Sequence, residues 1–337
     1  MEQYQETINQ LNAMVDEGIV PGMTYMIFDG TQEWTATRGW AQLKPTREKL
    51  RSGMLFDLAS LTKVVGTVPV IAMLIQEGEL HLDDPVQKYL PEFTDSRPTI
   101  RNLLTHTSGI RGYIPHRNEL PAAQLKRAFL TQQTVDSTLN RQIRYADVNY
   151  LYLGWIIERL CNQPVQEEIR QRVLEPLRMT TAGFHPDPAE AVPTEIQKGR
   201  GPIRGQVHDP KGYILGEHCG CAGLFAGLHD LVIFGRQLIE NNLEGMLNDE
   251  LVDAMFKDQT LISGPHSRSL GWKLLHDRRD GHFLISHTGF TGTWMILDRQ
   301  NDQGFILLSN RVHPTARNQK YLDCRDQIYA TYLREKN

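Results

Sequence analysis

Hydrophobic residues change their spacing along the chain, and the first change lies near the N-terminus. Segment 2–17 has its apolar positions at helical spacing, and Gly18 ends that run. The β-rich run 23–28 and the alternating run 33–41 follow, joined by Asp29-Gly30, a dipeptide typical of hairpins. The pattern therefore predicts one helix followed by two strands.

From Ser60 to about Met179 the pattern is mostly helical, beginning with the apolar run 64–77, which Gly78 ends. Between about Thr180 and His218 the chain is rich in Pro, Gly and His, which predicts a long surface connection. After Cys219 come a helical run and then short strand-like runs. These runs are GWKLLH, HFLISHTG, GTWMILDRQ and GFILLSN, and LDCRDQIYATYLREK closes the chain as a terminal helix.

Strands at both ends of the chain and helices in the middle predict a fold of the α/β class, of α+β type. We expect residues 1–66 and 216–337 to form one discontinuous α/β domain. Residues 67–215 would form an inserted helical domain that includes the long surface connection.

Size and charge narrow the function classes. The chain has 337 residues and a net charge of −4, which fits two domains or one two-lobed body and offers no basic surface for nucleic acid or membranes. The first residues carry no signal-peptide pattern, so a cytoplasmic protein is expected, although a chain trimmed of a leader would look the same. The four cysteines form no disulfide framework and predict free thiols.

One candidate for chemistry is Ser60-Leu-Thr-Lys63, at the start of the long apolar run. Positions three apart share a helix face, so the ammonium would lie within reach of the hydroxyl. Serine becomes a nucleophile when a base takes its proton, and a lysine can do this once burial lowers its pKa. The alternative is a helix-capping serine followed by a solvated lysine.

Two further groups lie far along the chain from this pair. Tyr145-Ala-Asp147 precedes a strongly apolar helix, where the tyrosine could move a proton and the aspartate could pair with Lys63. His287-Thr288-Gly289 ends a strand-like run, and the N–H of Phe290 is a candidate partner, with that of Ser60, for an oxyanion hole. Taken singly, each is explained as well by ordinary capping or a hairpin end.

The three groups, in this order, resemble the motifs S-x-x-K, Y-x-D/N and [K/H]-T-G of the serine β-lactamase and penicillin-binding protein superfamily. The phrases FDLASLTK, GELHLDDPVQKYLPEF, IRNLLTHTSGI and GCAGLFAGLHDL are similar to the branch with class C β-lactamases, DD-peptidases, D-aminopeptidases and related esterases. The resemblance covers about residues 18–310. It implies an antiparallel sheet flanked by terminal helices, with an inserted helical domain and the site in the cleft between them.

The resemblance also implies roles. Ser60 would be acylated, Lys63 and Tyr145 would share the acid and base roles, and His287 and Thr288 would line the edge strand beside the substrate. The implied function is a serine hydrolase, an esterase or D-amino-acid peptidase or amidase with weak β-lactamase activity at most. The alternative is a non-catalytic binding or sensing protein. The implied substrate is a small ester, amide or D-amino-acid peptide.

This sequence departs from the family pattern at three positions. Asp147 replaces the commoner asparagine, and a carboxylate there would favour the charged form of Lys63. His287 replaces lysine, and a neutral histidine would hold a substrate carboxylate less firmly. Cys221 stands in GCAGLF where histidine is expected.

No cofactor or metal is expected. GEHCGC lacks the second ligand pair of a zinc site and the chain has no H-E-x-x-H helix. His106, in THTSG, is expected to cap or pack rather than react. Tyr113, in the loop after Gly109, is a candidate cleft-lining residue.

Overall fold

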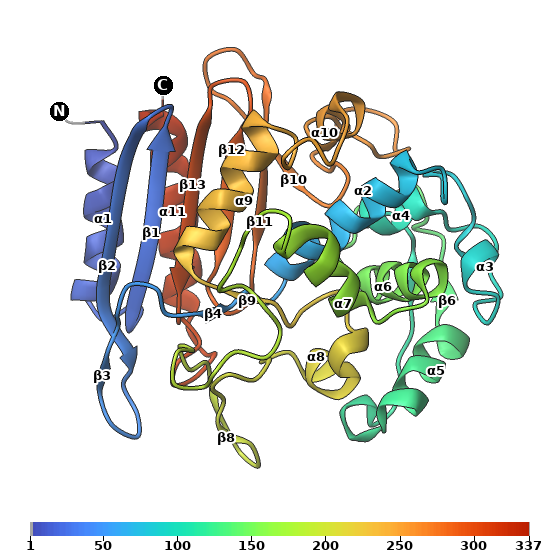
Figure 1. Cartoon of the computed structure of the whole chain (residues 1–337), viewed down its shortest axis with the longest axis horizontal. Helices are drawn as coiled ribbons and strands as arrows, with labels where there is room; N and C mark the ends of the chain where they lie inside the picture. The colour runs from blue at the N-terminus through green and yellow to red at the C-terminus, as the bar shows by residue number, and fades with distance from the viewer. Residues whose placement is uncertain (1–2, 337) are drawn as a thin grey trace.

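The computed structural model describes residues 3–336 and is built around one antiparallel sheet of seven strands (Figure 1). In spatial order the strands are β10 (Lys273–His276), β11 (Phe283–Thr288), β12 (Trp294–Asp298), β13 (Gln303–Ser309), β1 (Gly22–Asp29), β2 (Gln32–Gln42) and β3 (Glu48–Lys49). Strand β13 pairs with β1, so the two ends of the chain meet in the middle of the sheet. The predicted strands and their hairpin are confirmed.

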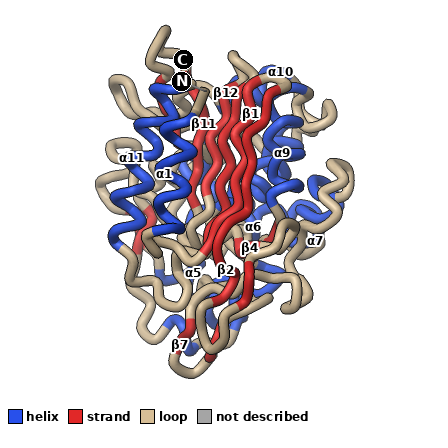
Figure 2. The backbone as a smooth tube through the Cα atoms, turned by 90° about the vertical axis from the view of Figure 1, so that its left-hand side faces the viewer, coloured by secondary structure: helices blue, strands red, loops and turns tan. Residues whose placement is uncertain are grey.

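Helices cover both faces of this sheet (Figure 2). The terminal helices α1 (Gln5–Asp16) and α11 (Gln319–Glu335) lie on one face, and α9 (Leu228–Glu240) lies on the other. Strand β1 serves both layers because alternate residues point to opposite faces: Tyr25 and Ile27 pack with the terminal helices, whereas Phe28 belongs to the main core.

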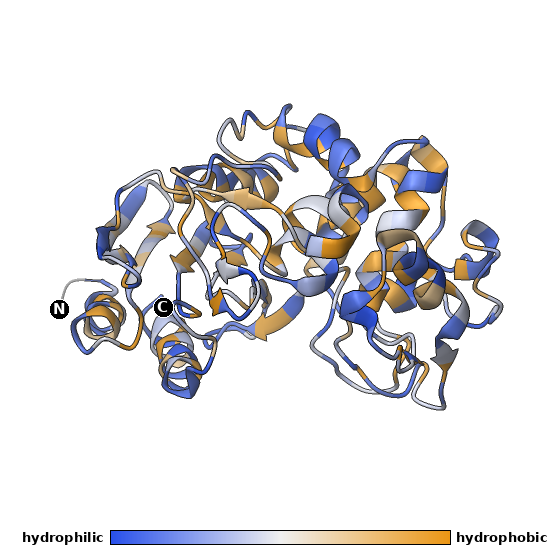
Figure 3. Ribbon diagram, turned by 90° about the horizontal axis from the view of Figure 1, so that it is seen from below, coloured by the Kyte–Doolittle hydropathy of each residue, from blue (hydrophilic) through white to orange (hydrophobic). Residues whose placement is uncertain are grey.

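The helices between the two groups of strands form a separate region, at the opposite side of the molecule from the chain ends (Figure 3). They are α2 (Val68–Gln76), α3 (Val86–Tyr89), α4 (Ile100–Leu104), α5 (Ala122–Gln132), α6 (Val148–Cys161) and α7 (Val165–Ile169). Helix α6 is buried continuously from Val148 to Ile157 and forms the centre of this region. The fold class predicted from the sequence is confirmed, whereas the domain boundaries at 66/67 and 215/216 stay predictions.

The predicted helix 64–77 does not begin as a regular α-helix. A π turn, η1 (Lys63–Thr67), precedes α2, and a second one, η3 (Arg170–Leu174), continues α7. Pro69 has no N–H to donate to the carbonyl of Val65, so the ordinary helical hydrogen bond cannot form there. The wider turn carries Lys63 at its first position.

The segment predicted as a long surface connection is more ordered than that. It contains the hairpin β7 (Ile196–Gln197) and β8 (Gly201–Pro202), helix α8 (Pro210–Leu215) and the 3₁₀ turn η4 (Gly216–His218). Ala191, Val192 and Lys211 are buried, so the surface assignment is wrong for part of it. The polar composition of this segment predicted that it would be exposed. However, His208 and Lys211 are buried and bond to Asp57 and Asp147 from other segments.

Five further short elements are β4, β9, α10, β5 and β6. Strand β4 (Phe56–Asp57) pairs with β9 (Phe225–Ala226), and β5 (Ile110–Arg111) pairs with β6 (Thr134–Val135). Helix α10 (Asp249–Met255) follows α9 in the chain. Within residues 3–336, no helix combines the length and apolar character needed to cross a membrane.

Candidate active site

Ser60 and Lys63 lie side by side at the junction between β4 and η1. The ammonium of Lys63 donates to Ser60 Oγ at 2.7 Å. The lysine side chain, at the first position of the π turn, is fully buried, whereas Ser60 remains partly accessible. The predicted proximity of this pair is therefore present in the structure.

The ammonium of Lys63 has all of its hydrogen-bond donors occupied. Besides Ser60, it contacts the carbonyl oxygen of Cys221 at 3.0 Å and a carboxylate oxygen of Asp147 at 2.9 Å. Burial by itself would lower the pKa of Lys63, but the carboxylate of Asp147 and the nearby Tyr145 raise that pKa well above its usual value. The expectation that burial lowers this pKa is therefore wrong, whereas the expectation that a carboxylate at position 147 favours the charged form of Lys63 agrees with it.

The carboxylate of Asp147 bridges two lysines. It also lies 3.2 Å from the ammonium of Lys211, which in turn contacts Asp209 at 2.8 Å. Burial opposes ionisation of Asp147, but the two ammonium groups hold its pKa well below the usual range. Lys211 was missed by sequence reasoning, because nothing in the sequence relates a lysine in the connection to a motif more than sixty residues earlier.

Tyr145 precedes α6 and lies over this charged group. Its ring centroid is 5.3 Å from Lys63 Nζ and 4.4 Å from the ring of His106. His106 is buried and its Nδ1 accepts the N–H of Ala146 at 3.2 Å, while burial lowers its pKa. The expectation that His106 packs is supported by these contacts, and the residue holds the segment that carries Tyr145 and Asp147.

His287 and Thr288 end strand β11, as the third motif requires. Nδ1 of His287 lies 3.1 Å from the carbonyl oxygen of Thr288. Because a carbonyl only accepts, Nδ1 carries the proton, and the buried Nε2, which has no partner among residues 3–336, is an acceptor. Burial and the cations of Lys63 and Arg268 lower the pKa of His287. A neutral imidazole in this tautomer cannot donate to a substrate carboxylate through Nε2.

Gly289 is required by a close approach between the third motif and the nucleophile turn. A Cβ at this position would lie 2.4 Å from the carbonyl oxygen of Leu58. The hydroxyl of Thr293 donates to the same carbonyl at 3.0 Å. The glycine therefore lets β11 dock directly against the residues before Ser60.

Two backbone N–H groups are free at this junction. Within residues 3–336, neither the N–H of Ser60 nor that of Phe290 has a hydrogen-bond partner. Ala59, just before the serine, has a φ of 46°, a left-handed conformation that few residues other than glycine adopt. Free N–H groups at a tight turn fit the predicted oxyanion hole.

The cysteine at position 221 contributes its backbone rather than its side chain. Its carbonyl oxygen holds Lys63, and the carbonyl of Gly220 accepts from the hydroxyl of Thr67 at 2.6 Å. The thiols of Cys219 and Cys221 are buried, with their sulfur atoms 3.5 Å apart. The structure therefore gives this segment a role in supporting the lysine.

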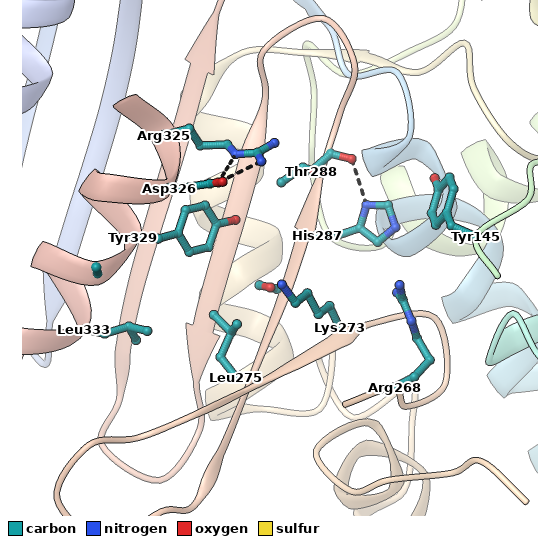
Figure 4. A pocket seen from close by; sticks show the side chains of 12 residues that line it. Tyr145, Arg268, Lys273, Leu275, His287, Thr288, Arg325, Asp326, Tyr329 and Leu333 are labelled. Atoms are coloured by element: carbon teal, nitrogen blue, oxygen red, sulfur yellow. Dashed lines mark hydrogen bonds and ion pairs between the residues drawn. The ribbon is translucent and has the colours of Figure 1, made fainter. Parts of the chain in front are cut away.

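A cavity of about 490 Å³ opens beside Tyr145 and His287 (Figure 4). Its lining residues are Tyr145, Arg268, Lys273, Leu275, Ser286, His287, Thr288, Arg325, Asp326, Tyr329, Ala330 and Leu333. Arg325 is paired with Asp326 at 2.8 Å, but no acidic side chain in residues 3–336 pairs with Arg268 or Lys273. The cavity therefore offers unneutralised positive charge.

Tyr113 lies in the segment after β5 and its side chain is 84% exposed. It is not among the residues that line this cavity. Its place beside a bound substrate stays a prediction.

The acidic groups elsewhere are already neutralised by protein cations. Asp277, Asp280 and His282 lie close enough to share an ion. However, Lys336 contacts Asp277 at 2.6 Å and His282 is hydrogen-bonded to Asp280 and to Asp298. This cluster is therefore explained as an ion-pair network that anchors the end of α11.

Comparison with known proteins gives consistent matches over most of the chain. The family model described as "Beta-lactamase" matches residues 6–326. A protein of Escherichia coli K12 named "Putative D-alanyl-D-alanine carboxypeptidase" is 27% identical over 94% of this chain and 85% of its own length.

Solved structures of related fold include a β-lactamase/D-alanine carboxypeptidase from Pseudomonas syringae. It is 18% identical, with a TM-score of 0.76 over 97% of each chain. The hydrolase EstCE1, described as having promiscuous acyltransferase activity, is 21% identical, with a TM-score of 0.75 over 96% of this chain and 98% of its own. At these identities the structural matches establish a common fold.

Proposed function

The chain belongs to the β-lactamase family, a family of serine hydrolases, and we propose that it forms an acyl-enzyme on Ser60 and hydrolyses small esters or D-amino-acid peptides and amides. The observation that carries this proposal is the 2.7 Å contact between Lys63 Nζ and Ser60 Oγ, beside two free backbone N–H groups. A nucleophile, a group that takes its proton and an oxyanion site are the parts that acyl transfer requires.

The charged state of Lys63 decides how the proton moves. An ammonium cannot accept a proton, so Tyr145, entering the reaction as its phenolate, is the group left to take the proton from Ser60 Oγ. The cation nearby stabilises negative charge on the phenol oxygen, and it also stabilises charge that develops on Ser60. Lys63 therefore acts electrostatically, and Tyr145 acts as base and then as acid.

The reaction then proceeds in two stages. Ser60 Oγ attacks the substrate carbonyl, and the N–H groups of Ser60 and Phe290 donate to the oxygen of the tetrahedral intermediate. Tyr145 returns its proton to the departing oxygen or nitrogen when the bond to the acyl carbon breaks. Water, deprotonated by the same tyrosine, releases the acid and restores Ser60.

The cavity shares Tyr145, His287 and Thr288 with the candidate site, although Ser60 is not among its lining residues. We infer that a substrate bound at Ser60 extends toward it. Arg268 and Lys273 supply positive charge where His287, in its neutral tautomer, supplies none. This arrangement favours a substrate with a carboxylate, such as the end of a short peptide, over a neutral ester.

The proposal is tested by intact-protein mass spectrometry after incubation with a fluorophosphonate, a β-lactam or a p-nitrophenyl ester. We expect a covalent adduct or ester turnover in the wild-type protein and neither in Ser60→Ala. Peptides ending in D-alanine, with a free or an amidated carboxyl group, would then compare the substrate classes. A folded wild-type protein that forms no adduct with any reagent would instead favour a non-catalytic binding protein.

A further inference from the structure

Asp57, the last residue of β4, is a buried acid that the reaction scheme does not use. One carboxylate oxygen accepts the N–H of Ala59 at 2.8 Å, and the other accepts the N–H of His208 at 2.7 Å. Its backbone carbonyl also accepts from the hydroxyl of Thr291 at 2.6 Å. Asp57 therefore forms hydrogen bonds with three segments: the turn that precedes Ser60, the connection 180–218 and the loop after β11.

The hydrogen bond from Ala59 to Asp57 affects the position of the Ser60 N–H, the first donor of the proposed oxyanion hole. Ala59 has a φ of 46°, which costs energy for a residue with a Cβ and needs support from its surroundings. A side-chain carboxylate that accepts an N–H two residues later stabilises turns of this kind. Because the peptide N–H of Ser60 follows Ala59 directly, the conformation of Ala59 sets its direction.

The hydrogen bond from His208 to Asp57 affects the position of the Phe290 N–H, the second donor of the proposed oxyanion hole. The ring of His208 stacks on that of Phe290, with centroids 5.5 Å apart and an interplanar angle of 22°. On another side, the guanidinium of Arg311 lies 4.7 Å from the same ring and its Nε donates to the Phe290 carbonyl at 2.7 Å. The ring of Phe290 thus packs against two side chains, one of which also bonds to the Phe290 carbonyl, and Asp57 holds the backbone of the other.

We propose that Asp57 is a positioning residue that fixes both N–H donors of the oxyanion hole, directly through Ala59 and indirectly through His208 and Phe290. The inference rests on the acyl-transfer function proposed above. It gives the connection a part in catalysis, because His208 belongs to that segment and is itself anchored to Glu195 at 3.1 Å.

The matched variants are Asp57→Asn and Asp230→Asn. An asparagine has one carbonyl oxygen and an amide group that cannot accept, so Asp57→Asn loses one of the two bonds. Asp230 is another buried carboxylate, in the first turn of α9, and it bonds to Thr181. Both substitutions lower stability, but only the first disturbs the oxyanion hole.

With the best ester or peptide substrate, we expect Asp57→Asn to lower kcat by about 100-fold, the effect of losing one oxyanion donor, with KM changed by less than about threefold. His208→Ala, which keeps the backbone bond but loses the stack, should lower kcat by about tenfold. Asp230→Asn should keep its kcat. If Asp57→Asn, confirmed as folded by circular dichroism, keeps the wild-type kcat, the inference is wrong.

A second measurement does not depend on turnover. The amide ¹H–¹⁵N resonances of Ser60 and Phe290 should both shift in Asp57→Asn, and neither should shift in Asp230→Asn. Unmoved resonances in Asp57→Asn would overturn the positioning role even if the protein is an active hydrolase. Shifted resonances in a protein that reacts with neither the fluorophosphonate, the β-lactam nor the p-nitrophenyl ester would support the positioning role while contradicting the proposed function.

Discussion

The segment 57–76 and the connection 180–218 both supply the site, yet they differ in how the sequence encodes them. The first presents Ser60 and Lys63 three positions apart at the start of an apolar run. The second has no periodicity and reads as surface, although Lys211 and the N–H of His208 reach the site from it. The difference teaches that a local motif encodes the reacting groups, whereas the residues that hold them in place are spread over distant segments.

The largest effect is expected in the first segment, from Lys63→Met. This variant removes the cation beside Ser60 and leaves Asp147 with one partner, so kcat/KM should fall by at least about 1000-fold. Steady-state kinetics measure the loss, and Lys88→Met, which removes an exposed ion pair with Asp84, serves as control. If Lys63→Met retained a tenth of the activity, the electrostatic role assigned to Lys63 would be wrong.

Gly289→Ala tests the contact between the first segment and β11. The added Cβ would lie 2.4 Å from the Leu58 carbonyl, so the two backbones must separate and the oxyanion hole must widen. We expect kcat to fall about 100-fold. Gly183→Ala is the matched control, since its Cβ would meet no atom within 4 Å. Equal activity of the two variants would show that catalysis does not require this close approach between Gly289 and Leu58.

Lys211→Met tests whether the connection contributes to the site. Removing one of the two ammonium groups around Asp147 should lower kcat by about tenfold and destabilise the protein by about 3 kcal/mol at pH 7. Lys211→Arg should restore part of both. A variant with wild-type kinetics would leave His208 as the residue through which the connection contributes to catalysis.

The pH dependence of that stability difference has a definite sign. The folded pKa of Asp147 is lowered, so its stabilisation is complete above its unfolded pKa of about 3.9 and is lost as the pH falls through the folded value. The folded pKa of Lys63 is raised, so its contribution is present below about 10.4 and is lost only at more alkaline pH. The melting temperature of Lys211→Met should therefore lie below that of the wild type near neutral pH, and the difference should shrink as the pH falls into the acid range.

The smallest effect is expected from His287→Asn. Because burial and nearby cations lower the pKa of His287, it stays neutral between about pH 6 and 8 and gives no inflection to the rate profile. The variant should lose about threefold in kcat/KM and keep the shape of the profile, measured with a substrate that does not titrate. An acidic limb that disappears in His287→Asn would show that His287 does ionise during turnover.

The sequence alone predicted the α+β fold, the paired strands at the two ends and the helices between them. It also predicted the nucleophile with its neighbouring lysine. These features depend on residues close in sequence, where spacing of 3.6 or 2 positions and turn residues dictate the local structure. The order of three motifs then indicated the family.

The charge of Lys63, the tautomer of His287 and the roles of Asp57, Lys211 and His208 were decided by tertiary structure. Each of these depends on a charge or hydrogen-bond partner supplied through the fold, such as the carboxylate of Asp147 or the carbonyl of Thr288, and burial strengthens such interactions. The sequence offered two opposite effects on the pKa of Lys63, since burial would lower it and the carboxylate of Asp147 would raise it. Only the fold places a carboxylate and a carbonyl around its ammonium, and their attraction outweighs the cost of removing it from water.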